Sequence, residues 1–245
     1  MKRYLKPAYL PVAVLGAGVL AFLFRLWLFA IGKDDRGLLA VGNFPDAMSW
    51  IVTALAMALI IWVCRMLQGG NKYSYNFGAS APAAIGMALA AVSFVINSII
   101  DLSAGTDSIG AISALLGFLA AASMLVLLFF RWQGKHFSVL FHGVVCFYLM
   151  LYLVSHYRLW SSAPQLQSYA FELLAIVFVM LACYQRAAFD TGKGNRRVYA
   201  LFSFVALYFC IAALPGSDNV AFFIGSAAWM YLTPCKLTLL IKKEN

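Results

Sequence analysis

The sequence predicts an all-α integral membrane protein in which a bundle of eight helices spans the bilayer. Three observations lead to this fold class. The 245 residues are 64% hydrophobic and only 11% charged, whereas soluble domains carry about 25% charged residues. The hydrophobic residues form long runs, and short segments rich in turn-forming residues separate these runs. Lysines and arginines gather in alternate breaks between the runs, as they do in polytopic membrane proteins.

Eight apolar runs have the length of a spanning helix, which needs roughly 20 apolar residues within a range of about 17 to 25. The first run follows Met1-Lys2-Arg3 and is too long for the apolar region of a cleaved signal peptide, so we expect it to be a span. The predicted spans lie near residues 8–31, 46–67, 80–102, 109–130, 137–157, 166–186, 197–214 and 219–241.

Turn-forming residues lie in each of the seven breaks between these spans. In order, the breaks contain Gly32–Asp35, Gly69–Asn71, Gly105–Asp107, Gly134–Lys135, Ser161–Pro164, Gly192–Asn195 and Pro215–Asp218. Pro215 could instead kink one long helix, but residues 197–241 are far too many to cross a bilayer once. No break is long enough for a soluble domain, so residues 1–245 are predicted to form a single transmembrane domain.

The basic residues predict the orientation, because lysine and arginine collect on the cytoplasmic side. With the N terminus inside, fourteen of the 18 basic residues are cytoplasmic. The four that remain outside are Arg25, Lys33, Arg36 and Arg158. An even number of spans then places both termini in the cytoplasm. We expect a multi-pass protein of the cell membrane, specifically a bacterial inner membrane, with the lipid bilayer as its main partner.

A parallel repeat of four helices and four helices is a further prediction. The sequence Arg-Leu-Trp at residues 25–27 recurs at residues 158–160, in each case at the outer end of a span. Residues 105–107, Gly-Thr-Asp, resemble residues 216–218, Gly-Ser-Asp. Such repeats occur in some transporters. The alternative is that short matches between apolar helices arise by chance.

Polar residues at the outer ends of the spans form the candidate site. Ionisable side chains inside a span are costly, and by default they face the bundle interior or a water-filled cavity. Seven residues fit this description: Arg25, Asp46, Asn97, Asp101, His156, Arg158 and Glu172. Arg25 and Glu172 are the deepest, roughly 9 Å from the outer helix ends. The group predicts an outward-facing pocket for a small polar or charged ligand. The alternative is structural ion pairing and contact with headgroups and water.

Several functional classes are not predicted. The five cysteines are an odd number without a C-x-x-C motif, so neither a disulfide framework nor a metal site is expected. The sequence has no H-E-x-x-H, G-x-S-x-G or Walker motif, and its three histidines do not supply a bis-histidine haem site, so we expect neither an enzyme nor a cofactor. The net charge of +9 is spread over short inter-span segments, which argues against nucleic-acid binding.

Three functions remain as hypotheses. The first is a small-solute transporter or permease subunit with the outward-facing pocket. The second is a non-transporting receptor, assembly factor or partner subunit whose outer-face charges serve docking. The third is an intramembrane enzyme acting on a lipid-linked substrate, with Glu172, Asp46 or Asp101 as acid or base. Below the outer group the sequence predicts mostly apolar packing with few polar residues, among them His142. This scarcity of polar residues in the inner half of the spans argues against transport.

Overall fold

The computed structural model describes residues 9–31, 43–67, 70, 73–104, 108–135, 138–161 and 169–232. Within them lie eight helices of 13 or more residues and one short helix. The helices are α1 (Leu10–Ile31), α2 (Phe44–Met66), α3 (Tyr73–Asn76), α4 (Ala81–Ser103), α5 (Ser108–Trp132), α6 (Val139–Trp160), α7 (Ala170–Asp190), α8 (Arg196–Ala213) and α9 (Val220–Leu232). The all-helical class is therefore confirmed.

Seven of these helices are long and apolar enough to cross a membrane, and they correspond to the first seven predicted spans. The largest difference is in α7, which begins at Ala170 and ends at Asp190 instead of covering 166–186. α8 ends at Ala213 and α9 begins at Val220, so Pro215 separates two helices, as predicted. α9 covers the first part of the eighth predicted span, and residues 233–241 of that span lie outside the described residues.

Local sequence signals fix several helix ends. Ser80, Ser138 and Asn195 each accept a hydrogen bond from a backbone N–H in the first turn of the helix that follows, which satisfies a donor that has no partner within the helix. Glycines with positive φ occupy three of the breaks between helices, where a residue with a Cβ would be strained: Gly134, Gly192 and Gly216.

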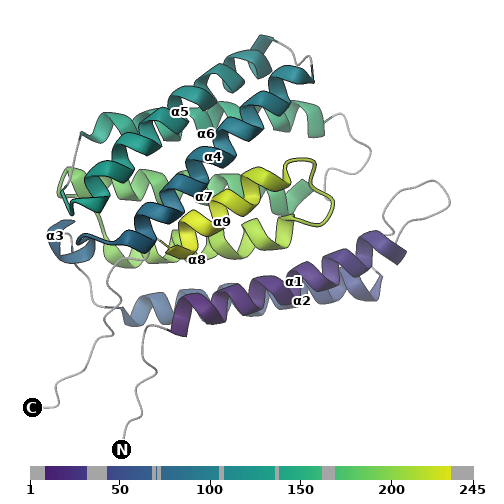
Figure 1. The fold of residues 1–245 in the computed structure, drawn as a ribbon. Coiled ribbons are helices and arrows are strands. Elements are labelled where there is room, and N and C mark those ends of the chain that lie inside the picture. Colours follow the sequence, from purple (N-terminus) through teal and green to yellow (C-terminus); the bar gives the residue numbers. More distant parts are fainter. Residues whose placement is uncertain are drawn as a thin grey trace, which may run out of the picture.

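Six helices form a closed ring (Figure 1). α4, α5, α6, α7, α8 and α9 pack each on the next, and α9 returns to pack on α4. α1 and α2 form a hairpin beside this ring, and both contact α8. The four-plus-four repeat stays a prediction. In such a repeat α7 would correspond to α2 and α8 to α4. The helix contacts of the two halves differ, because α7 packs extensively on α8, whereas α2 packs on α1 and α8.

Aromatic side chains fill the middle of the ring. Phe94 of α4 lies against Tyr148 of α6 and Phe222 of α9, with ring centroids 5.1 and 5.9 Å apart. Tyr152 of α6 stacks on Phe222 at 4.7 Å. Because α6 is not a ring neighbour of α4 or α9, the contacts that Tyr148 and Tyr152 make with these helices cross the centre of the bundle. On the α4–α9 side, a Cβ on Gly225 would collide with the side chain of Ser93, so glycine permits the close approach of the two helices.

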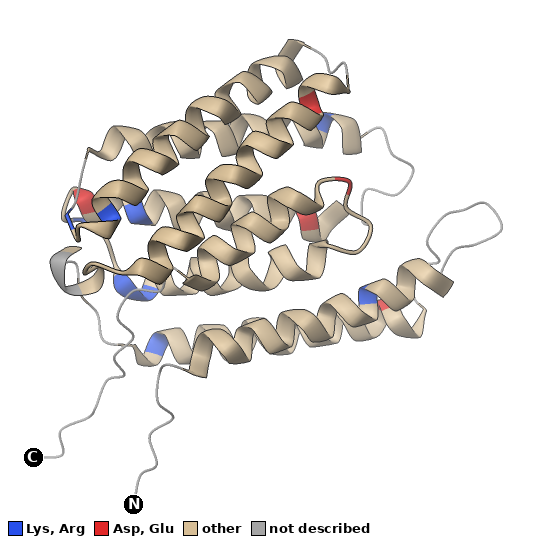
Figure 2. Ribbon diagram, in the orientation of Figure 1, with Lys and Arg blue, Asp and Glu red and all other residues tan. Residues whose placement is uncertain are grey.

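The two ends of the bundle differ in charge (Figure 2). Successive long helices run in alternating directions, so α1 begins and α9 ends at the same end. We call this the basic end, since it holds Arg65, Arg131, Arg186, Arg196 and Arg197. The opposite, acidic end holds Asp46, Asp101, Glu172 and Asp218. By the charge rule the basic end is predicted to face the cytoplasm.

Candidate functional site

The seven residues of the predicted site lie at the acidic end and differ in burial. The sequence predicts equal depths for Arg25 and Glu172, but Glu172 lies in the first turn of α7 and so nearer its helix end than Arg25 in α1. Each of the two residues is only 3% exposed. Asn97, Asp101 and His156 are also buried. Asp46 is half-buried in the first turn of α2, and Arg158 is exposed near the end of α6.

Arg25 is the cationic centre of the acidic end. Its guanidinium carbon lies 4.1 Å from the centroid of the Phe171 ring, which places it over the first turn of α7. From there it interacts electrostatically with the carboxylates of Glu172 and Asp46. Asp46 lies in the first turn of α2, the second helix of the α1–α2 hairpin, and this position brings it close to Arg25. A buried arginine needs such compensation, since removing a charge from water is expensive.

A second group of polar contacts joins α4 to α6. The side-chain amide of Asn97 donates to Asp101 Oδ2 at 3.1 Å and to the hydroxyl of Tyr148 at 3.5 Å. The hydroxyl of Tyr152 donates to Asn97 Oδ1 at 3.4 Å. Both oxygen and nitrogen of this buried amide are therefore engaged, as buried polar groups require.

His156 continues this group towards α9. Its Nδ1 lies 3.1 Å from the backbone carbonyl of Tyr152, which can only accept, so Nδ1 carries the proton of this hydrogen bond. Its Nε2 lies 2.9 Å from the side-chain nitrogen of Asn219, immediately before α9. Because that amide donates, Nε2 accepts, and the contacts fit a neutral imidazole with both nitrogens engaged.

The turn between α8 and α9 connects the two groups. The side chain of Ser217 lies near the Glu172 carboxyl. Asp218 interacts electrostatically with both Glu172 and His156. We call the connected set the acidic-end network; its members are Arg25, Asp46, Asn97, Asp101, Tyr148, Tyr152, His156, Glu172, Ser217, Asp218 and Asn219.

Six of the seven residues predicted from the sequence thus belong to this set, while Arg158 differs from them in being exposed. Sequence reasoning missed the tyrosines, although a signal was present. Tyr148, Tyr152 and His156 follow one another at intervals of four residues and so share a face of α6. The contributions of Ser217 and Asn219 had no such signal, because they depend on how one turn folds back over α7 and α6.

The basic end corrects the expectation of an almost uniformly apolar inner half. The side chains of Arg131, Arg186 and Arg196 are all buried there. His142 of α6 and Asp190 of α7 are buried as well, with Nδ1 and Oδ2 3.1 Å apart. Sequence reasoning ended the span at 186 and so placed Asp190 in a loop. The structure continues α7 to Asp190, one turn beyond Arg186 on the same face.

The buried arginines hold the segment 73–78, which contains α3, against the ring. Arg186 donates from Nη2 to the Tyr73 hydroxyl at 3.1 Å. Arg196 donates from Nε to Asn76 Oδ1, and Arg131 donates from Nη1 to the carbonyl of Gly78. Three different helices, α5, α7 and α8, thereby bind one short segment. Its backbone carbonyl and side-chain oxygens accept hydrogen bonds from the three buried guanidinium groups and so lower the cost of burying their charges.

Phe77 is the apolar centre of this closure. Its side chain has no exposed surface, and its ring contacts Phe189 and Tyr199 edge to face, with centroids 4.9 and 5.2 Å apart. The guanidinium carbon of Arg186 lies 3.8 Å from its centroid, a cation–π distance. Segment 73–78 therefore closes the basic end of the six-helix ring with one aromatic side chain and several ion–dipole contacts.

Within the described part of the chain, no three or more histidine, cysteine, aspartate or glutamate side chains are grouped so that they could hold a metal ion. No protein-family model matches the chain, and no curated protein or solved structure is significantly similar to it.

Proposed function

We propose that the chain is a small-solute transporter or permease subunit whose solute binds in the acidic-end network. The observation that supports this function is the convergence of buried ionisable residues from α1, α4, α6 and α7 at one end of the bundle. Intramembrane ionisable residues of this kind characterise substrate and proton pathways. A structural ion pair would need two such residues, whereas here the polar contacts extend over five helices and a turn.

The network offers recognition groups of both charges. Arg25 is a donor for an anionic group, and Glu172 and Asp46 are acceptors for a cationic one. Asn97, His156 and Asn219 add neutral hydrogen-bonding groups. A small polar or charged solute fits this composition, with Arg25 and Glu172 as its principal contacts. Both residues are 3% exposed, so solute binding requires the helices around them to move apart.

The basic end supports the same function, because transport also needs a closure on the opposite side. Segment 73–78 with Phe77 is suited to that role, since polar contacts that can be exchanged with water hold it in place. In a transport cycle this segment would move away from the ring while the acidic end closes.

A second function is that of a non-transporting partner subunit, and the position of the α1–α2 hairpin favours it. The hairpin packs on the ring through α8, and α2 presents a row of exposed apolar side chains, including Leu55, Leu59 and Trp62. In a partner subunit this face would contact another membrane protein, and Arg25 and Asp46 would only tie the hairpin to the ring.

Thermal unfolding of the detergent-purified protein in the presence of small polar and ionic compounds tests the proposal. A compound that binds the folded state at 100 times its Kd stabilises it by about 2.7 kcal/mol. We expect at least one compound to raise the wild-type Tm in a concentration-dependent manner. Glu172→Gln should lose this response, since it removes an acceptor charge from the network while keeping the side chain's size.

Asp190→Asn is the matched control, because it neutralises a buried carboxyl on the same helix roughly 27 Å away. It should keep the response to the compound. If no compound stabilises the wild type, or if Glu172→Gln responds as the wild type does, the solute pocket is rejected and the partner-subunit function is favoured.

A further inference from the structure

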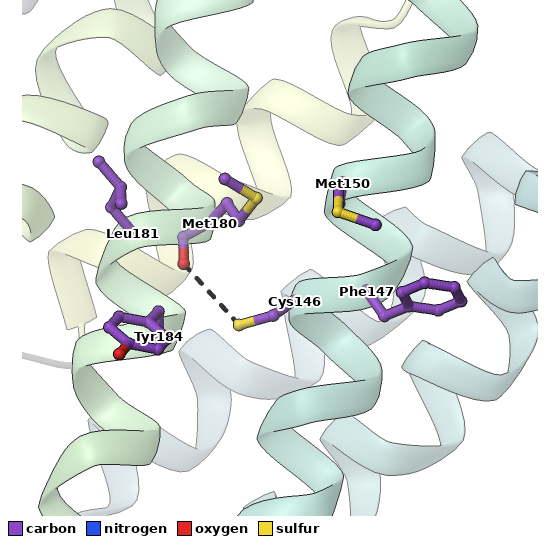
Figure 3. A pocket seen from close by; sticks show the side chains of 6 residues that line it. All are labelled: Cys146, Phe147, Met150, Met180, Leu181 and Tyr184. Carbon is purple, nitrogen blue, oxygen red and sulfur yellow. Dashed lines mark hydrogen bonds between the residues drawn. The ribbon is translucent and has the colours of Figure 1, made fainter.

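The groove between α6 and α7 is largely apolar (Figure 3). Its volume is about 460 Å³, and its lining residues are Cys146, Phe147, Met150, Met180, Leu181 and Tyr184. The thiol of Cys146 lies 3.8 Å from the carbonyl oxygen of Met180, within the same interface. None of the lining residues is charged, so the groove offers no group that would hold a charged ligand.

Arg186, at the basic end, has hydrogen-bonding capacity that the described residues do not use. The residue is 4% exposed. Its Nη2 donates to the Tyr73 hydroxyl at 3.1 Å, whereas its buried Nε and Nη1 donate to no described residue. The guanidinium lies over the ring of Phe77. Buried polar groups generally have hydrogen-bond partners, so two such donors in one guanidinium require an explanation.

Two further buried guanidinium groups lie close to Arg186. The guanidinium carbon of Arg131 is 5.4 Å from the centroid of the Phe77 ring, and that of Arg186 is 3.8 Å from the same centroid. Arg196 donates to the side chain of Asn76, the residue before Phe77. Three arginines from α5, α7 and α8 thus converge on residues 76 and 77. We call Arg131, Arg186 and Arg196 the arginine triad.

The predicted orientation of the chain does not account for the burial of the arginine triad. The charge rule concerns the side of the membrane on which lysines and arginines lie, and exposed residues satisfy it. Arg65 and Arg197 at the same end are exposed. Burying a guanidinium has a cost that these exposed residues avoid, which indicates a role for the triad other than topology.

Three oxygen atoms of segment 73–78 indicate what the arginine triad can bind. The Tyr73 hydroxyl, the Asn76 side-chain carbonyl and the backbone carbonyl of Gly78 each accept from a different arginine. A phosphate monoester also presents three acceptor oxygens, and it carries about two negative charges at neutral pH. Guanidinium groups bind charged oxygens more strongly than neutral ones and match the geometry of phosphate.

We propose that the arginine triad is a binding site for a phosphate group, either of inorganic phosphate or of a lipid headgroup, which exchanges with segment 73–78. The phosphate oxygens take the places of the three neutral oxygens and also engage the remaining donors of Arg186. Phe77 leaves the space between the guanidinium groups as the segment moves. Basic pockets between helices on the cytoplasmic side of membrane proteins bind lipid headgroups through the same chemistry.

This site is at the opposite end of the bundle from the acidic-end network. It would serve a partner subunit as well as a transporter, so the proposal does not rest on the proposed transport function.

Thermal unfolding of the detergent-purified full chain at neutral pH tests the phosphate site in two arms. One arm compares sodium phosphate with sodium chloride at equal ionic strength. The other compares mixed micelles containing phosphatidic acid, a phosphate monoester, with micelles containing phosphatidylglycerol, an anionic diester. We expect the Tm to rise with the concentration of the monoester ligand.

The two arms distinguish the sources of the phosphate. A response to sodium phosphate identifies free phosphate as a ligand, and a response confined to phosphatidic acid identifies a lipid headgroup. No response in either arm overturns the proposal. Equal stabilisation by phosphatidylglycerol would contradict recognition of three phosphate oxygens.

Asn76→Asp separates ligand competition from simple structural damage. The substitution places a carboxylate beside Arg196 without changing the size of the side chain. It should raise the Tm in the absence of phosphate. It should also weaken phosphate binding by about tenfold or more, because the carboxylate competes for the same donors and a hydrogen bond to a charged group has at least this effect. A purely structural role of Asn76 would lower the Tm instead.

Arg186→Lys keeps the positive charge but lacks the planar array of donors, so it should weaken phosphate binding by about tenfold or more. Arg197→Gln is the matched control. It removes a positive charge from the exposed position next to Arg196, and it should respond to phosphate as the wild type does. The proposal is overturned if Arg197→Gln weakens binding as much as Arg186→Lys, or if Asn76→Asp binds phosphate as tightly as the wild type.

Discussion

Replacing Arg25 with methionine is expected to lower the free energy of unfolding by about 3–5 kcal/mol, the usual effect of removing one partner from a buried charge pair. The substitution leaves the carboxylate of Glu172, which is 3% exposed, without its cationic neighbour. It also removes the guanidinium from the face of the Phe171 ring. Equilibrium unfolding of the purified protein in mixed micelles measures the change.

Two further variants separate the charge pair from the packing of the side chain. The double variant Arg25→Met/Glu172→Gln should be more stable than the sum of the single changes predicts, because Glu172→Gln removes the buried carboxyl that Arg25→Met leaves without its cationic neighbour. Arg158→Met removes an exposed arginine at the same end, and its effect should stay within about 0.5 kcal/mol. Equal effects of Arg25→Met and Arg158→Met would show that Arg25 is not held in a buried charge pair.

Phe77→Ala is expected to destabilise the protein by about 3–5 kcal/mol, as truncation of a buried phenylalanine typically does. The ring has no exposed surface, and its removal would leave a cavity bordered by Phe189, Tyr199 and the guanidinium of Arg186. Loss of the cation–π contact adds to the effect because Arg186 would stay buried. The same unfolding experiment measures this change.

Phe129→Ala makes the identical side-chain deletion on α5, where Phe129 is 59% exposed. Since that ring contacts few protein atoms, the deletion should have a much smaller effect. If the two variants were equally stable, Phe77 would not close the basic end in the way its contacts indicate.

The positions of the helices were largely predictable, because a bilayer imposes a narrow range of span lengths. The exception is α7, whose predicted end at residue 186 is one turn short of the observed end. Arg186 instead folds inward to Tyr73 and Phe77, and the helix continues to Asp190. Charge alone does not distinguish a residue that reaches water from one that is compensated inside the protein.

Part of the acidic end was predictable, because a common helix face can be read from spacing: Asn97 and Asp101 share a face of α4. The equal depth predicted for Arg25 and Glu172 is wrong, because α7 begins at Ala170 and so has Glu172 in its first turn. Segment 73–78 was not predictable. It is short, and its importance comes from arginines on three helices that are 53 to 120 residues away in sequence. Such long-range contacts have no local periodicity.

We predict that the acidic-end network faces the outside of the cell. Two exposed positions at opposite ends test it, residue 158 near the end of α6 and residue 193 between α7 and α8. In intact cells a membrane-impermeant maleimide should label Arg158→Cys, and it should label Lys193→Cys only after the membrane is permeabilised. The wild type is the background control. Labelling of Lys193→Cys in intact cells, with Arg158→Cys protected, would contradict the account.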